Sequence, residues 1–257
     1  MRILMIRHGD PDYERDGLTE KGKREAMLLA DRLAVEPISE VYVSPLGRAR
    51  ETASYTLEKL GCTAQEKDWL QEFPAKVDIN DSPLLQRAFP DAHQEKGRFS
   101  PHITWDILPE FWREVPEYYG REEWRRSPVS IHSDINEVYD RVAAGLDEVL
   151  AKHGYVREGS RYRTKQGNQD TIAFFCHFGV TCVLLAHLWG ASPYVLWHGM
   201  AMAPSSVTEV YTEERAKGEV LFRATKIGDI SHLYAAGEAP SFSARFCEVY
   251  ENEWERH

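Results

Sequence analysis

Cysteine is scarce in this sequence, and its spacing fits no zinc motif. The chain of 257 residues has four cysteines, and no two of them form a Cys-x-x-Cys pair. Zinc motifs are built on such pairs. We therefore expect free thiols in a reducing compartment and predict a cytoplasmic location. The cysteines are Cys62, Cys176, Cys182 and Cys247.

The ten histidines also lack the spacing of a helical metal motif. Neither His-x-x-x-His nor His-Glu-x-x-His occurs, although these are the spacings that place two metal ligands on one helix face. We expect no metal and no other cofactor.

Basic residues are outnumbered by acidic ones. The 31 Lys and Arg residues face 41 Asp and Glu residues, which gives a formal net charge of -10. Such a chain has no general attraction for nucleic acid or for anionic membranes. A small anionic substrate would need a local positive pocket that opposes this overall field. The sequence leaves a homo-oligomer open.

Neither a targeting segment nor a membrane span is visible. The N-terminus has no charged leader followed by an apolar stretch and a cleavage site, so we expect no signal peptide. One apolar stretch, 172–191, contains His177 and His187. Because ionisable groups are costly inside a bilayer, we interpret this stretch as a strand, a turn and a helix of a buried core.

Length and composition indicate a soluble globular protein. Apolar residues make up 42% and charged residues 28% of the chain, which is ordinary for that class. A chain of 257 residues lies near the upper size of a single hydrophobic core. We predict one domain over residues 1–257, with an irregular lid or cap inserted at about 73–130.

The predicted insertion is rich in proline and in aromatic residues. Long insertions in compact domains are often lids or binding loops. Two interpretations of the aromatic residues stay open, which are packing of a small separate core and stacking on a substrate ring. These residues are Trp105, Phe111, Trp112, Tyr118, Tyr119 and Trp124.

Two short apolar runs each end at a histidine. Ile3–Ile6 is followed by Arg7 and His8, and Thr171–Cys176 is followed by His177. Such runs are typical of buried strands in a parallel sheet. Ligands of open α/β sheets bind at the carboxyl ends of the strands. We therefore expect the two histidines to meet there if their strands are neighbours.

Helical patterns alternate with these strands. Apolar residues recur at helical spacing from Thr19 to Ala34, with Thr19 as the expected N-cap. After a β-prone run at 41–43, Ser44 is the expected N-cap of a second helix and Pro45 its first residue. This alternation predicts a three-layer α/β/α fold with a mostly parallel central sheet.

The start of the second helix is suited to an anion. The open N–H groups of a helix N-terminus attract anions. Arg48 and Arg50 lie in the first turns, and an arginine can hold a phosphate or carboxylate with two parallel hydrogen bonds. The alternative is that both arginines simply face solvent.

The rest of the chain adds a helix and two further strands. We expect a helix over 133–153, a polar and basic loop over 159–168, and strands over 206–212 and 220–227. The C-terminal tail is interpreted as a short helix. No internal repeat is present.

Several short motifs occur in order and together resemble one family. The sequence resembles the histidine phosphatase superfamily, also called the phosphoglycerate-mutase-like superfamily, in its phosphatase-type branch. The resemblance covers roughly residues 1–72 and 130–234, and it implies the phosphoglycerate mutase-like fold. The motifs are Arg7-His8-Gly9, Leu18-Thr19-x-x-Gly22, Ser44-x-Leu46-x-Arg48-Ala49-x-x-Thr52-Ala53, Leu70-x-Glu72, the strand ending in His177, Ser205-Ser206-Val207-Thr208, and Gly228-Asp229-x-Ser231-His232-Leu233.

The resemblance implies that a neutral histidine attacks phosphorus and becomes a phosphohistidine, which water then hydrolyses. It assigns the nucleophile to His8, and the phosphate pocket to Arg7, Arg48 and His177, with His177 also counted as catalytic. An unperturbed histidine is largely neutral at pH 7, so no strong base is needed. Positive charge around the phosphoryl oxygens supplies most of the catalysis in phosphoryl transfer, and here it would replace a metal.

Glu72 matches the proton donor of the family. It would protonate the leaving oxygen and later deprotonate the attacking water. The other interpretation of Glu72 is a surface carboxylate before a loop, with Asp10 as an alternative proton donor. Asp10 and Phe178 are also candidates for contacts with the substrate.

The sequence departs from the family pattern at positions that bear on the substrate. Glu14 stands where many members have Asn, and Pro11 stands where Thr or Ser is common. The run Glu72–Lys76 differs from the Glu-Arg-x-Tyr-Gly run of the authentic mutases. The pair His177 and Phe178 differs from the His-Asp pair of the phytase branch.

The resemblance therefore implies a phosphoric monoester hydrolase that acts on small phosphomonoesters without a metal. One alternative is a phosphomutase, which passes the phosphoryl group to a second hydroxyl instead of to water. Another is a binding module that keeps the fold without catalysis. The identity of the physiological substrate does not follow from the sequence.

Overall fold

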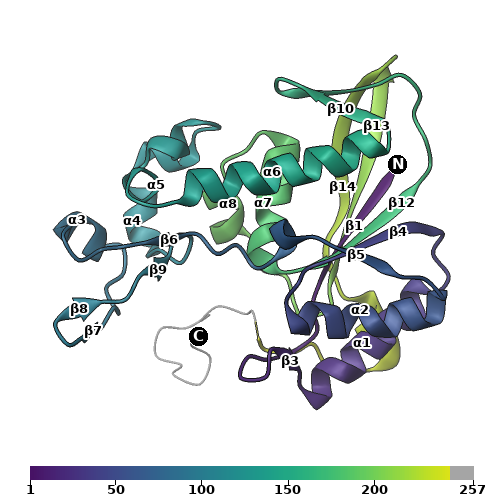
Figure 1. Cartoon of the computed structure of the whole chain (residues 1–257), viewed down its shortest axis with the longest axis horizontal. Coiled ribbons are helices and arrows are strands. Elements are labelled where there is room, and N and C mark those ends of the chain that lie inside the picture. Colours follow the sequence, from purple (N-terminus) through teal and green to yellow (C-terminus); the bar gives the residue numbers. More distant parts are fainter. Residues whose placement is uncertain (244–257) are drawn as a thin grey trace. The chain divides into compact units, whose positions relative to one another are not determined.

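The computed structural model describes residues 1–243 of the chain (Figure 1). Cys247 and the helix expected in the tail lie outside the described residues. Two compact units make up the chain. The first contains Met1–Glu72, Asp147–Thr181 and the residues from Ala201 onward, and the second contains Phe73–Leu146 and Cys182–Met200. The second unit thus begins where the insertion was predicted, while the assignment of one domain to the whole chain stays a prediction.

An eight-stranded sheet forms the framework of the first unit, in the order β10-β11-β14-β13-β1-β12-β4-β5. Four neighbouring strands at one side of the sheet are parallel to one another. Every residue of β12 is buried, as expected of a strand that is covered on both faces. The parallel strands are β1 (Arg2–Arg7), β12 (Thr171–Cys176), β4 (Ile38–Val43) and β5 (Ala64–Glu66).

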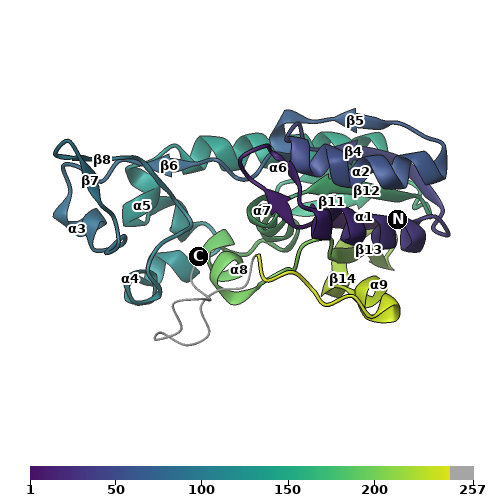
Figure 2. The same cartoon turned by 90° about the horizontal axis from the view of Figure 1, so that it is seen from below.

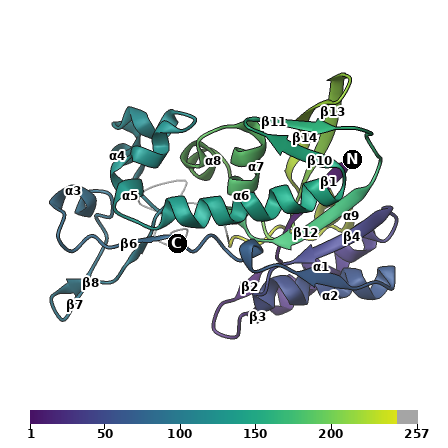
Figure 3. The same ribbon diagram turned by 45° about the horizontal axis from the view of Figure 1, so that its top comes forward.

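The remaining strands of this sheet pair in antiparallel fashion, with β10 at its edge (Figure 3). The predicted α/β fold with a sheet that is mostly parallel at its core is therefore confirmed, with an antiparallel half added to it. These strands are β13 (Val207–Ala216), β14 (Glu219–Asp229), β11 (Arg161–Thr164) and β10 (Tyr155–Glu158).

The prediction of a loop over 159–168 is wrong, because β11 lies within it. Tyr162 and Thr164 are buried, whereas Arg161 and Arg163 are exposed. This is the period of two that a strand with one buried face requires. The basic composition of the segment hid that alternation.

Helices α1 (Glu20–Leu33) and α2 (Gly47–Leu60) lie side by side (Figure 2). Thr19 is the N-cap of α1, as predicted, and its hydroxyl accepts a hydrogen bond from Gly22 N at 3.0 Å. Both helices pack against the sheet in one apolar cluster. Its members include Leu4, Ile6, Leu29, Leu33, Val43, Ala53 and Phe175. Shorter elements of this unit are β2 (Pro11–Asp12), β3 (Gly17–Leu18), η1 (Asp68–Leu70) and α9 (Ser231–Ala236).

Two longer helices contribute residues to both units. They are α6 (Ile135–Lys152), which confirms the helix predicted over 133–153, and α7 (Phe178–Trp189). Among the helices of residues 1–243, none combines the length and the hydrophobicity that crossing a bilayer requires.

Short helices and two small two-stranded sheets build the rest of the second unit, as expected for an irregular segment. A proline opens each of the helices α3, α4, η2, α5 and α8, where its missing N–H is not needed. The elements are β6 (Lys76–Val77), α3 (Pro83–Gln86), β7 (Gln94–Glu95), β8 (Arg98–Phe99), β9 (His102–Ile103), α4 (Pro109–Arg113), η2 (Pro116–Tyr119), η3 (Glu123–Arg126), α5 (Pro128–Ile131) and α8 (Pro193–Gly199).

Aromatic side chains pack the interior of the second unit. The rings of Tyr118 and Tyr194 lie 4.5 Å apart, and those of Trp124 and Tyr139 lie 4.9 Å apart. Trp124 and Tyr118 are almost fully buried, while Tyr119 is exposed. Packing of a separate small core therefore accounts for most of the aromatic residues of the insertion.

Candidate active site

His8 and His177 meet at the carboxyl ends of β1 and β12. The two strands are parallel neighbours whose last paired residues are Arg7 and Cys176. The backbone N–H of His8 donates to Cys176 O at 3.1 Å. The imidazole rings lie 5.0 Å apart at an angle of 56°, and both are almost completely buried. The expected convergence of the two histidines is confirmed.

A hydrogen bond fixes which nitrogen of His8 carries the proton. Its Nδ1 lies 2.7 Å from the carbonyl oxygen of Gly9. Because a carbonyl oxygen only accepts, Nδ1 is the donor and Nε2 keeps its lone pair in the neutral ring. Thr52 holds the same turn, since its Oγ1 accepts from Gly9 N at 2.9 Å.

Burial and nearby cations keep both imidazoles neutral. Desolvation lowers the pKa of His8 well below its usual 6.5, and the charges of Arg7 and Arg48 lower it further. Desolvation likewise lowers the pKa of His177, assisted by His8 and Arg48. Each ring is therefore uncharged at neutral pH, and His8 has a lone pair on Nε2 with which to attack.

Ser44 orients His177 and does not cap a helix. Its hydroxyl and His177 Nε2 share a hydrogen bond of 2.8 Å, and it also accepts from Leu46 N at 3.2 Å. The prediction that Ser44 and Pro45 open α2 is wrong, because Leu46 is extended and the helix begins at Gly47. His177 Nδ1 is buried and has no hydrogen-bond partner among the described groups.

Two of the three arginines that the sequence singled out lie beside these rings. Arg7 is 6% exposed, and its Nη1 donates to Met202 O at 2.5 Å. Arg48 is mostly buried in the first turn of α2, and its charge acts on both imidazoles. Arg50 is instead exposed and lies 3.6 Å from a carboxylate oxygen of Glu66, so it is a surface residue as the alternative interpretation held.

Glu72 lies next to His177 at the N-terminus of α7. Its Oε1 accepts from Gly179 N at 2.8 Å and from Val180 N at 3.3 Å. A carboxylate in this position stabilises the start of the helix. Glu72 is thus not a loose surface residue, and the role of proton donor stays a prediction.

Asp10 and Phe178 both have structural contacts. One carboxylate oxygen of Asp10 accepts from Thr19 Oγ1 at 2.7 Å, and the other bonds the hydroxyl of Ser241. Phe178 is the first residue of α7 and is 5% exposed. Contact of either residue with the substrate stays a prediction.

The structure adds residues to the site that the sequence did not single out. Asp16 bonds Arg48 through Oδ1 at 2.6 Å. Ser205 adopts a φ of 60°, its N–H donates to His8 O at 2.9 Å, and its hydroxyl lies 3.0 Å from His232 Nε2. The sequence signals for this second group were the run Ser205–Thr208 and the Gly228–Leu233 motif, which contain Ser205 and His232 but gave neither residue a role.

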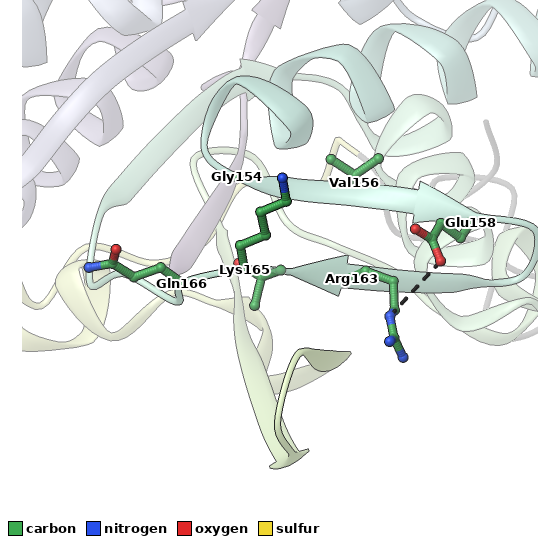
Figure 4. A pocket seen from close by; sticks show the side chains of 7 residues that line it. Gly154, Val156, Glu158, Arg163, Lys165 and Gln166 are labelled. Atoms are coloured by element: carbon green, nitrogen blue, oxygen red, sulfur yellow. Dashed lines mark ion pairs between the residues drawn. The ribbon is translucent and has the colours of Figure 1, made fainter.

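A cavity elsewhere in the first unit is formed by the β10–β11 hairpin (Figure 4). Its volume is about 650 Å³, and none of the predicted site residues lines it. Arg163 and Glu158 lie across it as an ion pair with an N–O distance of 3.9 Å. Over residues 1–243, no group of three or more His, Cys, Asp or Glu side chains is arranged to hold a metal ion.

Part of the chain matches a known protein family. Residues 3–103 match the profile of the histidine phosphatase superfamily (branch 1). The chain is 23% identical over 166 residues to phosphoserine phosphatase 1 of Hydrogenobacter thermophilus, which covers 60% of this chain and 66% of that protein. It is 30% identical over 103 residues to a probable phosphoglycerate mutase of Serratia proteamaculans, covering 37% of this chain and 47% of the relative. The chain thus spans less than two thirds of the length of these two relatives.

Solved structures share the fold at low sequence identity. A mycobacterial glucosyl-3-phosphoglycerate phosphatase with inorganic phosphate aligns with a TM-score of 0.55 and 18% identity, over 90% of this chain and 98% of that one. A phosphoserine phosphatase of Entamoeba histolytica aligns with a TM-score of 0.54 and 16% identity over the same shares. The family match covers less than half of the chain, and the likeness to the solved structures shows that the chain shares their fold.

Proposed function

We propose that this protein is a phosphatase that hydrolyses small phosphomonoesters through a phosphohistidine on His8. The observation that carries the proposal is the state of the His8 ring, which is buried and neutral and has its proton fixed on Nδ1. Nε2 attacks phosphorus, a P–N bond forms, and the bond to the leaving oxygen breaks. The phosphatases among the relatives support this choice of reaction.

Positive charge stabilises the transferring phosphoryl group in this proposal. Arg7, Arg48 and His177 surround the nucleophile, and their N–H groups would donate to the phosphoryl oxygens. A preorganised set of donors of this kind acts most strongly on charge that develops in the transition state. The two guanidinium groups supply the positive charge that this step requires, so the proposed reaction uses no metal.

Glu72 is the proposed proton donor. It gives a proton to the leaving oxygen in the first step and accepts one from water when water attacks the phosphohistidine. Its contacts with Gly179 and Val180 hold it at the start of α7, directly after His177. The second attack returns the Nε2 lone pair and releases inorganic phosphate.

The test is release of phosphate from a panel of small phosphomonoesters in excess chelator. We expect turnover by the wild type, and a loss of at least a thousandfold in His8→Ala because the nucleophile is gone, on the order of the loss seen for other nucleophiles. His132→Ala, which removes the exposed histidine that follows α5, should keep wild-type activity. Equal turnover in His8→Ala would contradict the proposal. Turnover only with a bisphosphorylated primer would favour the mutase.

We also propose that the protein works in the reducing environment of the cytoplasm. Of the cysteines within residues 1–243, Cys62, Cys176 and Cys182 are free thiols. Free thiols are typical of reducing compartments. Cell fractionation followed by alkylation of thiols tests this, and recovery of the protein in an oxidising compartment would contradict it.

A further inference from the structure

Asp16 is placed beside Arg48 by an unusual turn. It adopts a φ of 47°, in the left-handed region that residues other than glycine rarely adopt. Two hydrogen bonds of 2.6 Å hold its carboxylate, since Oδ2 accepts from Gly47 N and Oδ1 accepts from Arg48 Nη1. A rare conformation that is fixed by such contacts is characteristic of functional sites.

The carboxylate of Asp16 occupies the anion-binding end of α2. Gly47 is the first residue of this 14-residue helix, and a helix N-terminus favours a negative charge. The loop also comes very close to the helix here, because a Cβ on Gly47 would lie 2.1 Å from Asp16 O. The helix end that the sequence predicted for the substrate thus holds a carboxylate of the protein itself.

This carboxylate is ionised and reaches solvent. Partial burial favours its neutral form, but the Gly47 N–H and the Arg48 guanidinium outweigh that effect and hold the pKa of Asp16 below its usual value. The side chain of Asp16 is 42% exposed, whereas that of Arg48 is 11% exposed. A fixed negative charge that is more exposed than the Arg48 guanidinium therefore lies in contact with it.

We propose that Asp16 selects substrates by charge, so that the enzyme prefers phosphomonoesters whose leaving group carries no second anionic group. The inference rests on the proposed function, in which Arg48 holds the transferring phosphoryl group. Such a phosphoryl group would lie about one guanidinium's width from the Asp16 carboxylate. A carboxylate on the leaving group then meets a like charge nearby, while a hydroxyl or an ammonium group does not.

The experiment compares glycerol 3-phosphate with 3-phosphoglycerate, which are similar in size and differ in a second negative charge. Asp16→Asn keeps an oxygen that can accept from Gly47 N, and it removes the charge together with the acceptor for Arg48 Nη1. We expect this variant to raise the ratio of kcat/KM for 3-phosphoglycerate to that for glycerol 3-phosphate by about fivefold. Any effect on the shared phosphoryl group cancels in the ratio.

Asp12→Asn is the matched control, because Asp12 lies in the same loop and pairs with Arg15 at 2.6 Å. It should leave the ratio unchanged. A second measurement needs no variant, since added salt screens the repulsion and should raise the same ratio in the wild type.

The outcomes separate this inference from the function on which it rests. An unchanged ratio in Asp16→Asn, or an equal loss of activity on both substrates, would mean that Asp16 only holds the loop, and would overturn the inference alone. If Asp16→Asn does not fold, the wild type decides the question. A ratio of kcat/KM that does not change with added salt would then overturn the inference. Absence of turnover on every phosphomonoester overturns the proposed function as well.

Discussion

The neutral form of His8 results from the position of its side chain at the end of a buried strand. The carbonyl of Gly9 accepts a hydrogen bond from Nδ1–H, and desolvation together with two arginines opposes a second proton on the ring. No carboxylate is needed to activate the ring, because deprotonation has already been achieved by the environment. In the proposed mechanism, His8 is therefore ready to attack before the substrate arrives.

The charge and tautomer of His8 can be observed directly. Since its pKa lies well below 6.5, we expect the ¹⁵N signals of its imidazole at pH 6 to be those of a neutral ring protonated on Nδ1. His8→Gln identifies the signals by their loss, and the denatured chain gives the reference for a titrating ring. A His8 ring that is half protonated near pH 6.5 would contradict this account.

Ser44 should matter for catalysis through His177. In Ser44→Ala, His177 Nε2 loses its hydrogen bond, and we expect kcat/KM to fall about fivefold, since such a bond contributes on the order of 1 kcal/mol. Ser54→Ala is the control, because that hydroxyl is exposed and donates only to Glu51 O. A loss of less than twofold in Ser44→Ala would show that the bond does not orient the ring.

At the scale of single residues, the sequence predicts which histidines come together better than it predicts the hydrogen bonds around the site. The pairing of His8 with His177 follows from two apolar runs that end alike. The contact between Asp16 and Arg48 does not follow from the sequence, because it requires a positive φ at Asp16. The polar residues of this loop do not by themselves specify that conformation. Ser44 likewise has the sequence context of an N-cap, and only the neighbouring strand brings His177 to it.

Helix α1 packs against the turn that follows His8 through a glycine. A Cβ on Gly22 would lie 2.2 Å from Asp10 O, and one on Gly9 would lie 2.7 Å from Gly22 O. The backbone that follows His8 thus lies directly against the first turn of α1. This contact gives a physical reason for glycine at the end of the Leu18-Thr19-x-x-Gly22 motif.

Gly22→Ala should therefore destabilise the protein, although alanine is normally the better residue within a helix. The added methyl group meets backbone that cannot move without displacing His8. We expect a loss of about 2 kcal/mol in the free energy of unfolding and a large loss of activity. Lys23→Ala, in the next position of α1, should change neither by much, and an unaffected Gly22→Ala would show that the turn is loosely packed.

Most elements of the first unit could be predicted because their apolar periodicity is strong. β1, β12 and α1 are where the patterns place them. β11 was missed because four alternating residues in a basic context give a weak signal. The start of α2 was misplaced because a side chain engaged in a distant contact cannot be distinguished from a cap in the sequence.

At the scale of the whole molecule, buried histidines make stability depend on pH. The pKa values of His8 and His177 lie well below 6.5, and those of His198 and His232 lie at about 4, chiefly because burial disfavours the charged ring. The unfolded chain binds protons at these sites below pH 6.5, whereas the folded protein does not. Glu25 opposes this trend, since burial raises its pKa to about 7.

We therefore expect the free energy of unfolding to fall as the pH is lowered from 7 to 5.5. Below pH 6.5, each buried histidine lowers the free energy of unfolding by roughly 1 kcal/mol per pH unit. Protonation of Glu25 in the folded protein offsets the effect of about one histidine. Denaturation by urea at the two pH values measures the difference, and His232→Gln should reduce it. Stability that is unchanged or higher at pH 5.5 would contradict this expectation.

The most direct test of the account is to trap the covalent intermediate. Rapid quenching in alkali during turnover, followed by mass spectrometry of peptides, locates any phosphoryl group on the chain. The account predicts one phosphate on the peptide that contains His8, bound to nitrogen and therefore lost in acid, and none in His8→Ala. Phosphate on another residue, or full turnover without any adduct, would contradict the claim that His8 is the nucleophile.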